Sequence, residues 1–282
     1  MLEFSLSASV TPGTGISFVT AVFELFESFE ALMLMTALTA IRIYAAMTVL
    51  PATAEAVLPG LTRGALASII AGFIAFGQPT ANVMQLGAGA LFVLALKELL
   101  IGVLIGFSAA TVFWIAESVG ALIDTQTGYN SVQMSNPMSS EQSTPVSVLL
   151  LQFCVMLFYA LGGMLVFLGA LLESFKVWPL MSSLPSMANA AEVFVAQQVD
   201  TLMTVTLKFA APVLLILLLI DIGVGLITRV ADKLEPASVG QPLKAAVGMV
   251  VLALMISVFA AQVRQYLLPT DLMQRLHQML PK

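Results

Sequence analysis

The chain has 282 residues, of which 59% are hydrophobic and only 10% are charged. Because soluble domains carry about 25% charged residues, this composition excludes an ordinary soluble protein and indicates an integral membrane protein. The formal net charge of −5, without any basic stripe, argues against nucleic acid as a partner.

Six long apolar runs are candidates for membrane helices, since about 20 apolar residues cross the hydrocarbon core of a bilayer. In chain order they are residues 29–50, 61–77, 86–115, 146–172, 201–228 and 245–268. The fifth run contains Pro212, which predicts a kink. We therefore predict an all-α integral membrane protein with about six long apolar helices.

The runs group into two units. The first four form an N-terminal helical part at residues 28–199, and the last two form a C-terminal helical hairpin at 200–268. An acidic segment at 1–27 precedes them, and a tail at 269–282 follows.

Two local features stand out within the N-terminal part. Residues 173–199 contain two prolines and are predicted to form a loop, in which Trp178 suits the membrane interface. In the third run, Gly102 and Gly106 form a GxxxG motif, which would let a neighbouring helix approach closely.

A polar stretch, residues 117–145, separates the third and fourth apolar runs. It reads ESVGALIDTQTGYNSVQMSNPMSSEQSTP and contains three acidic residues but no Lys or Arg. One interpretation is a solvated loop between two membrane helices. The other is irregular backbone held inside an assembly, where it lines or plugs a passage, because non-helical chain at membrane depth needs protein or water as hydrogen-bond partner.

Several charged residues lie within or at the edges of the apolar runs, where a charge is costly and is usually paired or faces a cavity. Arg42 lies 12 residues after Glu30, and Asp221 lies 13 residues after Lys208, so each must find its partner on another helix or another chain. Lys97 and Glu98 are adjacent and are expected to point to different sides of their helix.

Three interpretations of these charges remain open. They could be structural ion pairs that fix helix packing. They could form a proton or ion relay, for which Glu98 and Asp221 are the candidates. They could also pair with partner subunits.

The sequence contains no Walker A, GxSxG or HExxH motif and no carboxylate pair at metal spacing. With one cysteine and one histidine, it offers no Cys/His-rich metal site either. We therefore predict that the protein is not an enzyme and carries no metal and no cofactor.

Four ordered blocks of the sequence resemble the T/R subunit of the type III secretion export gate, the family called SctT in injectisomes and FliR in flagella. The blocks are KELLIGVLIGFSAATVFWIAESVGALIDTQTG at 97–128, NPMSSEQSTPVSVLLLQF at 136–153, GGMLVFLGALLESFKVWP at 162–179, and APVLLILLLIDIGVGLITRVADKLEP with QPLK at 211–244. Arg42, Pro51, Pro59 and Arg63 stand at the spacing of that family.

Two details refine the resemblance. The segment SSEQSTP at 139–145 resembles the injectisome branch more than the flagellar one. At 124–128 the chain reads DTQTG where injectisome members often have Asp-x-Gln-Arg-Gly, so no role of that arginine can be transferred.

The resemblance implies a pore-forming subunit of the export gate in the bacterial inner membrane, which passes unfolded substrates. It implies a hetero-oligomer with the other small membrane subunits of the gate. Further implied partners are the switch (autoprotease) export subunit, the needle or inner-rod protein and the exported unfolded polypeptides.

The resemblance also implies that the loop at 117–145 plugs the closed pore. Candidate pore and plug residues are Gly120, Asp124, Gln126, Gly128, Met134 and Pro137. Candidates for assembly or for buried charge are Arg42, Lys97, Glu98, Lys208, Asp221, Arg229 and Lys244. The alternative function is a stand-alone proton- or solute-coupled secondary transporter, and a third is a scaffold that only nucleates assembly.

Overall fold

The computed structural model describes residues 15–78, 83–84, 86–132, 134–135, 142–182, 187–230 and 236–267. Its helices are α1 (Gly15–Val49), α2 (Gly60–Phe76), α3 (Ala88–Thr127), α4 (Pro145–Ala160), α5 (Gly163–Val177), α6 (Met187–Val230) and α7 (Pro236–Leu267). Two single turns of 3-10 helix, η1 (Pro51–Thr53) and η2 (Tyr129–Ser131), and two short antiparallel strands, β1 (Met134–Ser135) and β2 (Gln142–Ser143), complete the described elements. The predicted all-α class is confirmed.

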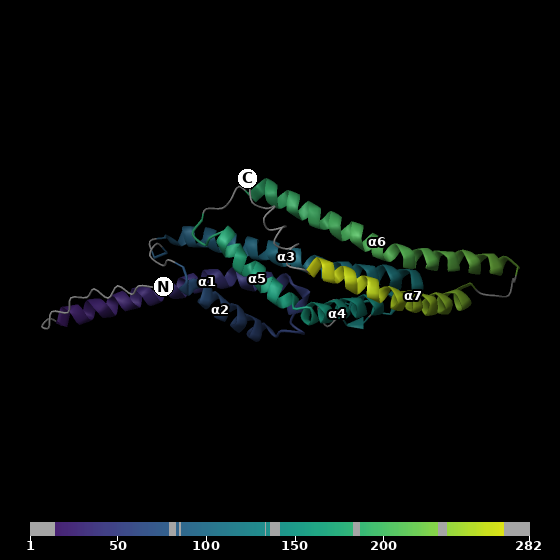
Figure 1. Cartoon of the computed structure of the whole chain (residues 1–282), viewed down its shortest axis with the longest axis horizontal. Coiled ribbons are helices and arrows are strands. Elements are labelled where there is room, and N and C mark those ends of the chain that lie inside the picture. Colours follow the sequence, from purple (N-terminus) through teal and green to yellow (C-terminus); the bar gives the residue numbers. More distant parts are fainter. Residues whose placement is uncertain are drawn as a thin grey trace.

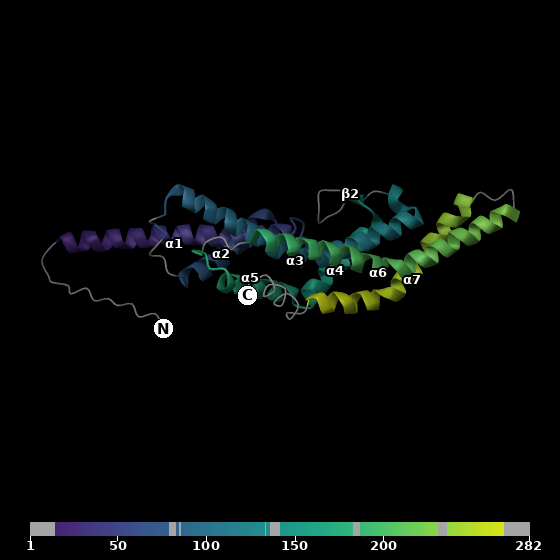
Figure 2. The ribbon, with the colours of Figure 1, turned by 90° about the horizontal axis from the view of Figure 1, so that it is seen from above.

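Helix α3 is the centre of the molecule. It packs against α1 on one side and against α4, α6 and α7 on the others. The molecule is elongated, with the start of α1 projecting at one end and the α6–α7 hairpin reaching out at the other (Figures 1 and 2). Helix α3 therefore carries both groups of residues described below: its first half packs on α1, and its second half packs on α4.

Three helical segments are long and apolar enough to cross a membrane: Val22–Val49, Ala88–Thr127 and Glu192–Arg229. Helices α4 and α5 meet at an angle of 72° and would make a fourth span if they act as one broken span. The described residues thus support three or four spans by length and composition, fewer than the six apolar runs of the sequence.

The boundaries of two predicted segments differ from the structure. The loop predicted at 117–145 is helical up to Thr127, because only Gly128, with φ of +85°, ends α3. Between Glu117 and Thr127 there is no proline and only one glycine, so polar composition alone does not stop the helix. The connection between α3 and α4 is therefore residues 128–144.

The second difference concerns the predicted loop at 173–199. Helix α5 continues to Val177 and α6 begins at Met187, so much of this segment is helical. Trp178 is only 5% exposed and packs in the apolar core of the chain. Its position at the membrane interface stays a prediction.

The structure also differs from the sequence prediction inside one apolar run and at two predicted domain boundaries. The run at 146–172 is broken at Gly162, whose φ is +75°. Helix α1 is continuous across residues 27 and 28, and α6 is continuous across 199 and 200 and through Pro212.

Candidate functional site

A buried charge network joins α1 to α3. Arg42 donates from Nε to Oε2 of Glu98 at 2.5 Å and from Nη2 to Oε1 at 2.9 Å. Lys97 Nζ lies 3.1 Å from the same Oε1, and the side chains of all three residues are at most 1% exposed. One carboxylate therefore balances two cations in the interior.

The same cations hold the chain that follows α5. Arg42 donates to Ser174 Oγ at 3.1 Å and to the carbonyl oxygen of Trp178 at 3.0 Å, and its guanidinium lies 3.9 Å from the centre of the Phe175 ring. Lys97 donates to three backbone carbonyls, those of Pro179, Leu180 and Ser182. The network therefore fixes the end of α5 and the turn after it onto α1 and α3.

These contacts decide two expectations from the sequence. Arg42 does find its partner on another helix, as predicted, and that helix belongs to the same chain. Lys97 and Glu98 were expected to point to different sides of α3; their ends nevertheless meet, because the long lysine side chain reaches the neighbouring carboxylate.

The GxxxG motif of α3 makes this contact possible. A Cβ atom at Gly102 would lie 2.3 Å from the carbonyl oxygen of Arg42, and one at Gly106 would lie 2.6 Å from the carbonyl oxygen of Ala46. Only glycine lets the two backbones approach this closely. Glu98 lies one turn before Gly102, so the same approach brings its carboxylate to Arg42.

The remaining predicted charges lie on the C-terminal hairpin. Lys244 Nζ of α7 lies 2.9 Å from Asp221 Oδ1 of α6, with the two side chains 14% and 42% exposed. Lys208 and Arg229 are exposed on α6. The predicted charges therefore fall into two groups: Arg42, Lys97 and Glu98 form one buried network, and the charges of the C-terminal hairpin lie nearer the surface.

Asp124, near the end of α3, joins the two ends of the connection between α3 and α4. Its Oδ2 accepts hydrogen bonds from the backbone N–H groups of Val146 at 2.8 Å and Ser147 at 3.2 Å. These N–H groups belong to the first turn of α4, so Asp124 caps α4 from another helix. Asp124 is fully buried, and its Oδ1 has no hydrogen-bond partner among the described residues.

Gly120, one turn before Asp124, brings the two helices into contact. A Cβ atom there would lie 2.3 Å from Cα of Ser147, so the start of α4 rests directly on α3. Above this base, β1 pairs with β2, with Met134 opposite Ser143. Ser143 also donates a long hydrogen bond, 3.4 Å, to Glu117 of α3. Ser143, near the end of the loop, therefore lies against α3 beside Glu117.

The structure places the predicted pore residues in two groups. Gly120, Asp124 and Gly128 lie at the base of the loop, where the first two are buried between α3 and α4. Gln126 is exposed on the last turn of α3, and Met134 lies in β1. Pro137 lies outside the described residues.

Comparison with known proteins shows a clear family. The model of the family described as "Bacterial export proteins, family 1" matches residues 33–269. Yop proteins translocation protein T of Yersinia pestis is 29% identical over 214 residues, which cover 76% of this chain and 82% of that protein. Secretion system apparatus protein SsaT of Salmonella typhimurium is 30% identical over 174 residues, covering 62% of this chain and 66% of that protein. Flagellar biosynthetic protein FliR of Caulobacter vibrioides is 26% identical over 222 residues, covering 78% and 88%.

Proposed function

The chain belongs to family 1 of the bacterial export proteins, and from this we propose that it is a pore-forming subunit of the export gate of a type III secretion system. The family and the long apolar helices make it a multi-pass protein of the bacterial inner membrane that serves protein export and is not an enzyme. Identities of 29% and 30% to the Yersinia and Salmonella secretion proteins exceed the 25–26% to three flagellar FliR proteins, which favours the injectisome branch.

The observation that carries the pore proposal is the loop at 128–144 with its clamped base. Its two ends are tied together by Asp124 and by the contact of Gly120 with the start of α4. Because these contacts lie at the ends of α3 and α4, a displacement of the loop does not require either helix to unwind. The sequence of the loop contains no Lys or Arg and few large apolar residues. When the loop leaves the closed pore, little apolar surface becomes exposed to water, so opening costs little free energy. The loop acts as the plug of the closed pore.

The partners follow from this role. The other small membrane subunits of the gate form a hetero-oligomer with the chain and cover apolar faces such as that of α6, where Leu215 and Leu219 are each 59% exposed. The switch export subunit, the needle or inner-rod protein and exported unfolded polypeptides are the further partners.

The secondary transporter finds less support. A relay needs carboxylates that can bind and release a proton during transport. Glu98 is instead held by Arg42 and Lys97, and Asp221 pairs with Lys244. The buried network supports the interpretation of structural pairs that fix helix packing within this chain.

Deleting residues 128–135 from the chain in the complete secretion apparatus tests the plug. The gate should still assemble, as judged by co-purification of its subunits, and the inner membrane should become leaky to small molecules. As a control, the same variant expressed without the other gate subunits should not leak, because no pore forms. Unchanged permeability with an assembled gate would contradict the proposal.

A further inference from the structure

Arg63, near the start of α2, is a buried cation without a counter-ion among the described residues. It is only 9% exposed. Its Nη1 donates to the carbonyl oxygen of Thr53 at 3.3 Å, and its guanidinium lies 5.3 Å from the centre of the Tyr44 ring. Its Nε is buried without a hydrogen-bond partner, and no described Asp or Glu forms an ion pair with it. A buried charge left in this way is costly, so an anion from outside the described chain would stabilise it.

Arg42 shows how the same side chain is satisfied elsewhere in the molecule. Its Nε and Nη2 donate to the two carboxylate oxygens of Glu98. In Arg63 the corresponding edge, formed by Nε and Nη2, makes no hydrogen bond with the described residues. Because the planar guanidinium matches carboxylate and phosphate groups with two parallel hydrogen bonds, this edge fits one oxyanion.

The start of α2 adds backbone donors near Arg63. Pro59 is the N-cap residue and no side chain caps the helix, so the N–H groups of the first turn lack the acceptor that a cap supplies. A helix start also carries a partial positive charge, which favours anions. The side chain of Arg63 points back toward this end, as helical side chains do, because it reaches Thr53 in η1.

The surface beside these donors is open. Gly60 and Gly64 flank Arg63 along α2, and a Cβ atom at either glycine would meet no atom within 4 Å. Glu55, the acidic residue nearest to Arg63 in the sequence, is exposed and forms no ion pair with it. An anion from outside can therefore approach this end of α2 past the two glycines.

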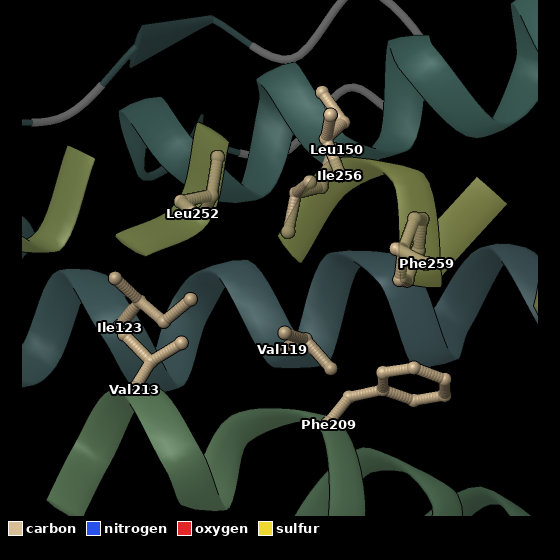
Figure 3. A pocket seen from close by; sticks show the side chains of 8 residues that line it. All are labelled: Val119, Ile123, Leu150, Phe209, Val213, Leu252, Ile256 and Phe259. Carbon is tan, nitrogen blue, oxygen red and sulfur yellow. The ribbon is translucent and has the colours of Figure 1, made fainter. Parts of the chain in front are cut away.

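A cavity between α3, α4, α6 and α7 offers no such donors. It holds about 30 Å³ and is lined by apolar side chains alone, among them Val119, Phe209 and Phe259 (Figure 3). A charged ligand would lose its hydrogen bonds to water there without gaining others. The start of α2 is therefore the better position for an anion.

The depth of Arg63 in the membrane indicates which anion it meets. With Val22–Val49 across the bilayer, its 28 residues are about 42 Å long, close to the roughly 40–45 Å of a bilayer with its headgroups. Tyr44 lies about 7.5 Å before the end of this span, so the guanidinium beside its ring lies near the lipid phosphates. Arg and Tyr both favour this interfacial depth.

The outer surface of α2 also fits a lipid, since Ile69, Phe73 and Phe76 are exposed along it. We propose that Arg63 and the start of α2 bind the phosphate group of an anionic phospholipid, whose acyl chains lie along the apolar surface of α2. Basic positions between membrane helices bind such headgroups in other proteins. The inference goes beyond the proposed function and does not depend on the role of the loop at 128–144.

Binding of short-chain phosphatidylglycerol to the detergent-solubilised export complex tests the inference. Short-chain phosphatidylcholine is the lipid without net charge, and glycerol phosphate supplies the phosphate without acyl chains. Bound lipid is measured by native mass spectrometry and stabilisation by the melting temperature. Phosphatidylglycerol should bind the unmodified complex at least tenfold more tightly than either control compound. Arg63→Gln should weaken this binding at least tenfold, whereas Arg229→Gln, at an exposed arginine of α6, should leave it unchanged.

A second variant, Gly60→Asp, supplies the anion from the chain itself. Its Cβ atom would meet no atom within 4 Å, and a carboxylate is favoured in the first turn of a helix. The variant should melt at a higher temperature without lipid and should no longer respond to phosphatidylglycerol, although Arg63 is present. Gly89→Asp is the matched control, because it adds the same charge to the first turn of α3 at another open glycine and should keep the response.

Equal binding of phosphatidylglycerol by the unmodified, Arg63→Gln and Gly60→Asp complexes would overturn the inference. Binding of glycerol phosphate as tight as that of phosphatidylglycerol would also overturn it, because a free phosphate would then be sufficient. A third result would assign the anion to a carboxylate of a partner subunit and contradict the lipid site: none of the compounds binds the unmodified complex, and Arg63→Gln loses subunits during purification.

Discussion

Replacing Glu98 with Gln should destabilise the protein severely. Glu98 is fully buried and accepts hydrogen bonds from Arg42, with Lys97 Nζ 3.1 Å from one of its oxygens. Removing one partner of a buried ion pair costs about 3–5 kcal/mol, because the other charge stays in the interior without compensation. Here one substitution leaves two cations uncompensated, so the loss in the free energy of unfolding should lie toward about 5 kcal/mol, which is roughly a several-thousandfold change in the folding equilibrium.

The size of the effect should depend on which member is removed. Arg42→Gln should cost less than Glu98→Gln, since Glu98 keeps Lys97 as its counter-ion. Asp221→Asn removes a carboxylate that is 42% exposed and should cost less than about 1 kcal/mol. The expected order therefore follows the number of buried charges left unpaired.

Thermal unfolding of the detergent-solubilised export complex measures this order, with the amount of complex recovered as a second readout. Asp221→Asn is the matched control, because it also neutralises a carboxylate paired between two helices. Equal stability of Glu98→Gln and Asp221→Asn would refute the claim that the buried network holds α1, α3 and the turn after α5 together. A Glu98→Gln variant that assembles fully but loses coupled transport would favour the secondary transporter instead.

Two further substitutions test the close helix contacts. Gly106→Ala would place a Cβ atom 2.6 Å from the carbonyl oxygen of Ala46 and should lower the free energy of unfolding by about 1–3 kcal/mol. Gly89→Ala in the same helix meets no atom within 4 Å and should leave the melting temperature unchanged. Equal melting temperatures of the two variants would contradict the close contact at Gly106. Asp124→Ala removes the acceptor of the Val146 N–H group and should cost about 1–2 kcal/mol, with faster hydrogen exchange in the first turn of α4, whereas Asp124→Asn keeps an acceptor and should cost less. Identical exchange in Asp124→Ala and the unmodified protein would show that Asp124 does not cap α4.

Composition and local pattern were sufficient for the class of the protein and for some of its contacts. A chain with so few charges has to be a membrane protein, and Gly102 and Gly106 indicated a close helix contact that the structure shows between α3 and α1. Spacing along the helix also showed that Arg42 needs a partner from elsewhere. Each of these features depends on composition or on residues close together in the chain, which a sequence shows directly.

Helix ends were harder to predict where polarity and helix propensity disagree. Residues 117–127 are polar, and the sequence interpretation made them part of a loop, but they contain no helix-breaking proline and α3 continues through them. The signal that marks the true end is Gly128, which adopts a left-handed conformation favoured by glycine. In the same way, Gly162 marks the bend inside the apolar run at 146–172.

Pairings between distant residues were beyond the sequence. Arg42 and Glu98 are 56 positions apart, and many carboxylates could have satisfied the arginine equally well. The role of Asp124 was missed for the same reason, because Thr144 and Pro145 indicate the start of α4 but not which acceptor caps it. Such pairs depend on which helices meet, and that is decided by packing of the whole chain.

The conductance of the purified export gate in a planar bilayer tests the central claim most directly. With the unmodified chain the assembled gate should stay closed to ions, and with residues 128–135 deleted it should show open channels. Equal conductance of the two assembled gates would contradict the claim that this chain forms part of the pore and that its loop closes it.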